Sequence, residues 1–126
     1  MGLYENTTGL TDQNAAVKMP TGVAYATLGK VLRGAKVDLA KTAALALPAT
    51  VAGGAFTTTG GKSVVVLWAK ASSGEGATGT YAVSAAGPVI ARGWDFSTTG
   101  ATTTVMPASG RATLSLTSTP QLFEVP

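Results

Sequence analysis

Hydrophobic and polar residues alternate, or run together in short blocks, over most of the chain after Lys36, and these patterns predict β-strands. The stretch 62–70 is the strongest of them: one face carries Val64, Val66 and Trp68, and the other carries Val65, Leu67 and Ala69. A strand that is apolar on both faces is covered on both sides. We therefore expect a central strand here with Trp68 in the core, so that Trp68→Ala costs roughly 3–5 kcal/mol.

Other short strand patterns are separated by Gly, Pro and Ser turns. They cover residues 37–39, 43–47, 55–57, 80–85, 89–96, 102–106, 112–116 and 121–125. Many short strands at such spacing predict an all-β fold, an antiparallel β-sandwich or jelly roll. Residues 102–106 and 112–116 are expected to form a hairpin around the turn 107–110.

The region before Lys36 predicts one N-terminal helix, over about residues 20–33. Pro20 suits the first turn, Gly34 suits a C-terminal stop, and the apolar positions recur every three to four residues. These positions are Ala24, Leu28, Val31 and Leu32. The apolar stripe must pack on a sheet of this chain or on a neighbouring domain. The predicted division is an N-terminal segment, residues 1–36, followed by a β-sandwich module, residues 37–126.

Composition points to an extracellular domain. Charged residues make up only 12% of the 126 residues, against about 25% in typical soluble domains. Threonine, serine and glycine supply the polar surface instead, in runs such as 57–61 and 102–104. The chain has no cysteine, no basic segment before an apolar stretch and no apolar run long enough to span a membrane. We interpret it as a piece of a longer secreted protein.

The residue inventory argues against catalysis and against nucleic-acid binding. With no histidine, the usual general base and the commonest zinc ligand are missing. The six carboxylates, Glu5, Asp12, Asp38, Glu75, Asp95 and Glu124, occur in no catalytic motif. The basic residues do not cluster as phosphate binding requires, despite a net charge of +3. A loop calcium ion at Asp95 or Glu75 remains an alternative to ordinary solvated acids.

An aromatic residue beside an arginine provides the candidate ligand site. Trp94 shares a predicted strand face with Arg92 and Phe96, and tryptophan rings stack on the apolar C–H face of sugars. The predicted ligand-binding residues are Trp94, Arg92, Asp95, Ser97 and Thr98. In the alternative interpretation, Trp94 fills the sandwich core and Arg92 extends past it to solvent.

Two parts of the sequence resemble a known family. Residues 19–28 with 32–35 (MPTGVAYATL and LRGA) resemble the last barrel helix of clan-A-type glycoside hydrolases. Residues 64–69 (VVVLWA) with 112–123 (ATLSLTSTPQLF) are similar to the small C-terminal β-sandwich that follows that barrel. The resemblance extends from about Pro20 to Val125. The family's catalytic glutamates belong to the barrel, which this chain lacks, so no catalytic residue carries over.

Together these features predict a non-catalytic accessory β-sandwich of a secreted carbohydrate-active enzyme. Its expected partners are a polysaccharide or oligosaccharide and the catalytic domain of the parent protein. One alternative is a purely structural domain that stabilises this catalytic partner. Another is a Thr-rich surface adhesin, phage-particle or ice-binding module, although consecutive threonines point to both faces of a strand and do not form a flat ladder.

Overall fold

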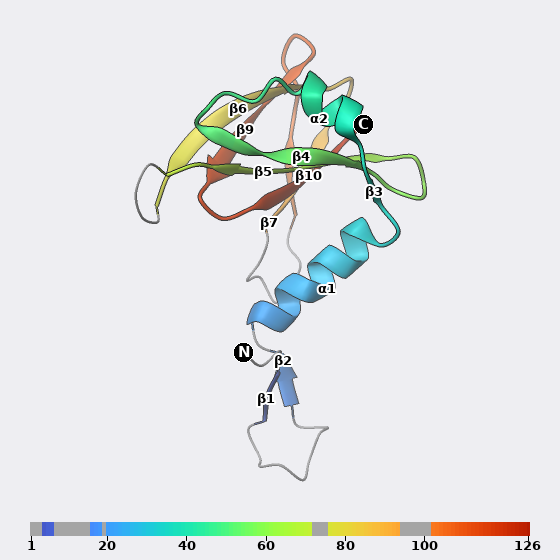
Figure 1. Cartoon of the computed structure of the whole chain (residues 1–126), viewed down its shortest axis with the longest axis vertical. Helices are drawn as coiled ribbons and strands as arrows, with labels where there is room; N and C mark the ends of the chain where they lie inside the picture. Colours follow the sequence, from blue (N-terminus) through green and yellow to red (C-terminus); the bar gives the residue numbers. More distant parts are fainter. Residues whose placement is uncertain (1–3, 7–15, 19, 72–75, 94–101) are drawn as a thin grey trace.

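The computed structural model describes residues 4–6, 16–18, 20–71, 76–93 and 102–126 (Figure 1). Its elements are β1 (Tyr4–Asn6), β2 (Ala16–Lys18), α1 (Pro20–Leu32), β3 (Lys36–Val37), α2 (Leu39–Ala44), β4 (Val51–Thr57), β5 (Ser63–Ala69), β6 (Thr78–Ser84), β7 (Val89–Gly93), β8 (Thr102–Val105), β9 (Arg111–Thr117) and β10 (Gln121–Val125). Every described strand pair is antiparallel. The predicted all-β antiparallel sandwich with an N-terminal helix is therefore confirmed.

The sandwich has two unequal layers. A six-stranded sheet with the order β3-β4-β5-β10-β7-β8 packs against a two-stranded sheet of β6 and β9. The hairpin expected for residues 102–106 and 112–116 does not form, because β8 pairs with β7 in the six-stranded sheet while β9 pairs with β6 in the other. The chain passes from one layer to the other through a tight turn in which Ala108 is bridged to Arg111. A separate hairpin of β1 and β2 lies at the far end of α1 from the sandwich (Figure 1).

The core lies between the two sheets. Alternate residues of each strand point inward, as the pleat requires. On β9 the alternation is strict: Ala112, Leu114 and Leu116 are buried, and the residues between them are exposed. They meet inward side chains of the six-stranded sheet, including Leu67 and Phe123, which are 0% and 1% exposed. Burial of this apolar surface is the main force that holds the sheets together.

We call the other side of the six-stranded sheet its outer face. Strand alternation and register place on it Ala52, Gly54, Phe56, Val64, Val66, Trp68, Ile90, Arg92, Leu122 and Glu124. Val64 and Leu122 are fully buried there, so β5 is a central strand covered on both sides over part of its length, as predicted.

Trp68 is not a core residue, and this corrects the prediction from sequence. Its side chain is partly exposed on the outer face, while the core side of β5 is filled by Val65, Leu67 and Ala69. Both faces of β5 are apolar, so the pattern alone could not tell which of them meets the second sheet. Because this ring is only partly buried, we expect Trp68→Ala to cost less than the 3–5 kcal/mol of a core truncation.

Helix α2 replaces the strand predicted from the alternation over 43–47. Asp38 caps the helix, since its Oδ1 accepts a hydrogen bond of 2.9 Å from the Lys41 amide. The alanine-rich sequence that follows favours a helix in its own right. The Thr42 hydroxyl accepts a hydrogen bond of 2.9 Å from the Ala55 amide and so ties α2 to β4.

Helix α1 begins and ends close to the predicted positions and meets the sandwich at its C-terminal end. Gly34 follows it with a φ of 68°, and a Cβ built there would lie 2.8 Å from Thr59 Cγ2. Leu28, Val31 and Leu32 of the apolar stripe are only partly buried. Neither of the described helices is long and apolar enough to cross a membrane.

Asp38 makes the stability of the domain dependent on pH. Its pKa lies below the usual value because the Lys41 amide and the Thr57 hydroxyl donate to the carboxylate, and partial burial only weakens this effect. A lowered pKa adds stability above the unfolded-state value near 3.8, and this is lost as pH falls through the folded-state value.

We therefore expect the urea midpoint to fall between pH 6 and pH 3, and to fall less in Asp38→Asn. Asparagine still accepts the capping hydrogen bond but does not titrate. Equal acid losses in the two proteins would show that Asp38 does not contribute to the pH dependence.

Candidate functional site

Arg92 forms an ion pair on the outer face. Its Nε donates a hydrogen bond of 2.8 Å to Oε1 of Glu124. The pair joins β7 to β10, because the register sets Arg92 opposite Leu122 and Ile90 opposite Glu124. The side chains are 22% and 21% exposed, so the pair is half-buried and still within reach of a ligand. A carboxylate beside a guanidinium offers both acceptors and donors to a polar ligand.

A cleft of about 310 Å³ opens beside this pair. It lies between the end of α1, the β4–β5 turn and the outer face, and its walls are mainly polar. The lining residues are Lys30, Val31, Arg33, Thr58, Thr59, Lys62, Val64, Arg92 and Glu124. The fold thus gathers four cations and one carboxylate from parts of the chain that are far apart in sequence.

A second cleft, of about 570 Å³, continues from the first around the end of the sheet. Lys62 and Glu124 line both clefts, so the two adjoin. The second cleft adds apolar surface from Pro88, Ile90 and Pro126. We call the two adjoining clefts together the Lys62 groove.

Trp68 supplies an aromatic ring on the same face. Val66, Leu122 and Arg92 lie side by side on β5, β10 and β7, and Trp68 is two residues beyond Val66. From strand spacing, the Cα atoms of Trp68 and Arg92 lie about 12 Å apart. Sequence reasoning missed this role for Trp68 because it assigned the ring to the core.

Of the predicted ligand-binding residues, only Arg92 lies within the described residues. It pairs with Glu124, a residue that sequence reasoning considered only as one of six carboxylates. Trp94, Asp95, Ser97 and Thr98 lie outside the described residues, as does Glu75, the second calcium candidate. The part of the chain that the structure describes holds no group of three or more residues suited to a metal ion.

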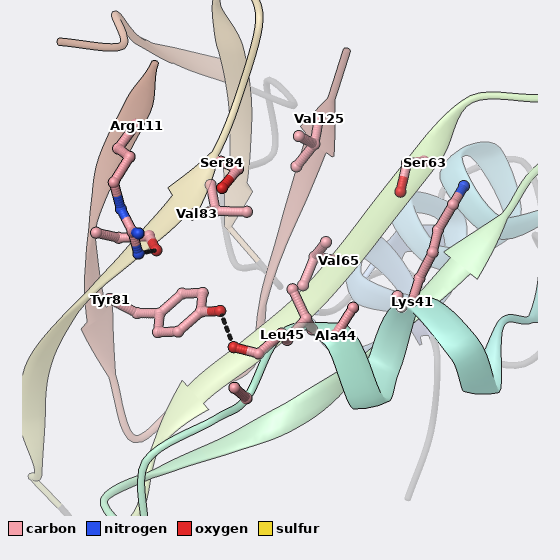
Figure 2. Close-up of a pocket in the computed structure, with 13 residues that line it drawn as sticks. Lys41, Ala44, Leu45, Ser63, Val65, Tyr81, Val83, Ser84, Arg111 and Val125 are labelled. Atoms are coloured by element: carbon pink, nitrogen blue, oxygen red, sulfur yellow. Dashed lines mark hydrogen bonds between the residues drawn. The ribbon is translucent and has the colours of Figure 1, made fainter. Parts of the chain in front are cut away.

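A cavity of about 430 Å³ lies between α2 and the two sheets (Figure 2). Tyr81 points across it and donates a hydrogen bond to the Leu45 carbonyl, and burial raises the pKa of this phenol. Arg111 donates to the Ala82 carbonyl at 2.7 Å, and Lys41 pairs with Asp38 at 3.7 Å. These polar groups make contacts within the protein, so we interpret this cavity as one end of the core.

The solvent side of the two-stranded sheet carries a ladder of hydroxyl groups. Thr78 lies opposite Thr117, and Thr80 lies opposite Ser115, all of them exposed. This ladder arises from alternate positions of β6 and β9, not from the consecutive threonine runs. It breaks at the next pair, where Ala82 faces Thr113. With two such rungs, the ladder is a narrow polar surface that contains no aromatic side chain.

Comparison with known proteins assigns the chain to no family. No protein-family model matches the sequence, and no curated protein matches it. The candidate site is therefore defined by the geometry of the outer face: Trp68, the Arg92–Glu124 pair and the Lys62 groove.

Proposed function

We propose that this chain is a non-catalytic accessory module of a secreted carbohydrate-active enzyme, and that it binds a glycan on its outer face. The observation that carries the proposal is the combination on one face of a partly exposed tryptophan and a half-buried Arg–Glu pair beside a groove. Ligand sites typically combine apolar and aromatic surface with a few oriented polar groups.

Each component has a defined role in this proposal. The Trp68 ring stacks on the C–H face of one sugar unit, while Arg92 donates to and Glu124 accepts from hydroxyl groups further along the chain. The separation of about 12 Å between Trp68 and Arg92 suits an oligosaccharide better than a single sugar. Trp94, Asp95, Ser97 and Thr98 follow Arg92 in sequence and remain part of the proposed platform. The module itself hydrolyses no glycoside, since no carboxylate pair with a supporting motif is present in the sequence.

Binding should be weak, with a Kd of about 0.1–1 mM, because a single small platform contributes only about −4 to −5.5 kcal/mol. Attachment to a catalytic domain would then supply the retention that one site lacks.

The test is a calorimetric titration with hexasaccharides of cellulose, xylan, mannan and galacturonan. We expect wild type to bind at least one of them and Trp68→Ala to weaken that binding by tenfold or more. Arg92→Lys keeps the positive charge but loses the planar guanidinium with its several N–H donors, so this variant should also bind the glycan more weakly. Thr80→Ala, on the hydroxyl ladder, is the matched control and should bind like wild type. Full binding by a folded Trp68→Ala variant would show that the platform is misplaced.

A structural role is the second candidate function. Tyr25 on α1 is 64% exposed, and Val37 and Leu39, on either side of Asp38, are 61% and 76% exposed. Exposed apolar side chains of this size favour contact with a partner domain. If wild type binds none of the hexasaccharides, this scaffold role becomes the better account.

A further inference from the structure

We infer that the Lys62 groove selects anionic glycans, those that carry carboxylate or sulfate groups, over neutral ones. The inference rests on the proposed glycan-binding function and specifies its ligand class. It is carried by the charges that the fold gathers around the groove.

The first cleft is lined by Lys30, Arg33, Lys62 and Arg92 against one carboxylate, Glu124. Among the residues that the structure describes, only Arg92 of these four cations forms an ion pair. The Arg92–Glu124 pair is neutral as a unit, so within the described lining of the cleft Lys30, Arg33 and Lys62 leave a surplus of three positive charges. This surplus favours a ligand that brings negative charge.

The cations come from different parts of the fold. Lys30 lies on α1 and Arg33 directly follows it, while Lys62 comes from the β4–β5 turn and lines both clefts. An extended chain with one anionic group on each unit can therefore contact several cations at once. Thr58 and Thr59 lie in the same cleft and offer hydroxyl donors to the ring oxygens and hydroxyls of such a chain.

The concave shape of the first cleft strengthens the attraction of its cations for negative charge. Charges inside a cleft with low-dielectric walls are less screened than charges on an open surface. The apolar side chains of Val31 and Val64 form part of the wall of the first cleft. The groove should therefore attract an anionic chain more strongly than the overall charge of +3 alone would.

The experiment compares hexagalacturonate with its fully methyl-esterified form, which keeps the sugar backbone and removes the charge. Dextran sulfate and uncharged dextran form a second pair that distinguishes sulfate from carboxylate. At about 50 mM salt, where the Debye length is above 10 Å, we expect each anionic member to bind about tenfold tighter than its neutral partner. Raising the salt to about 1 M should remove most of this difference.

Matched variants locate the effect in the groove. Lys62→Gln and Lys70→Gln each remove one positive charge, but Lys70 is an exposed residue outside both clefts. We expect Lys62→Gln to weaken hexagalacturonate binding by about threefold to fivefold, in line with a partly exposed charge contact, and Lys70→Gln to leave it unchanged. Neither change should alter binding of the methyl ester.

The two proposals fail in different ways. Equal binding of hexagalacturonate and its ester, or equal losses in Lys62→Gln and Lys70→Gln, would overturn the anionic preference and leave glycan binding standing. No binding to any charged or neutral saccharide would overturn the proposed function, and this inference with it.

Discussion

Gly53→Ala should destabilise the domain by about 4 kcal/mol or more, enough to leave much of it unfolded. Gly53 lies in the middle of β4 with a φ of 149°, a conformation that side chains rarely adopt. A Cβ built there would lie 2.0 Å from the Val66 carbonyl oxygen and 3.0 Å from Leu67 Cα. Both atoms belong to the backbone of β5, so the clash can be relieved only by separating the two strands.

Gly61→Ala is the matched control for this prediction. Gly61 also has a positive φ, 76°, but a Cβ built there meets no atom within 4 Å. Its cost should be limited to backbone strain of about 1–2 kcal/mol. The free energies of unfolding of the two variants in urea separate the cost of backbone strain from the cost of the steric clash. Equal values would mean that β4 and β5 are not packed as described.

Phe123→Ala should cost roughly 3–5 kcal/mol, the largest loss expected from a single core truncation. Phe123 is 1% exposed, and its strand, β10, lies between β5 and β7. Removing the ring leaves a cavity that hydrogen-bonded strands on both sides cannot close.

Trp68→Ala should cost less than Phe123→Ala, about 1–2 kcal/mol, because the Trp68 ring is only partly buried. If urea unfolding shows the larger loss for Trp68→Ala, the outer face is more enclosed than the structure indicates.

The main layers of the fold could be predicted because they follow from periodicity. The alternation on β9 and the doubly apolar β5 are local patterns, and the helix 20–32 is bounded by Pro20 and Gly34. Helix α2 was missed because alternating Ala and Leu over a few residues also fits a strand. Its capping hydrogen bonds, from the Lys41 amide and the Thr57 hydroxyl to Asp38, depend partly on tertiary structure. The predicted boundary between residues 36 and 37 stays a prediction.

The candidate site could be predicted only in part. Arg92 stood out beside an aromatic residue, but its partner Glu124 is 32 residues away and depends on the register of β7 and β10. The cations Lys30 and Arg33 reach the groove only because α1 ends against the β4–β5 turn. Neither long-range contact leaves a local signal in the sequence. The role of Trp94 and of the residues that follow it stays a prediction.

Backbone amide NMR shifts test most directly whether the outer face binds a glycan, as we propose. The protein would be titrated with the hexasaccharide that it binds best, and the shifts mapped onto the sheets. We expect changes at Val66, Leu122 and Arg92 and at the Trp68 indole, with little change at Thr80 and Ser115 on the hydroxyl ladder. Shifts confined to β6 and β9, with the outer face unaffected, would contradict it.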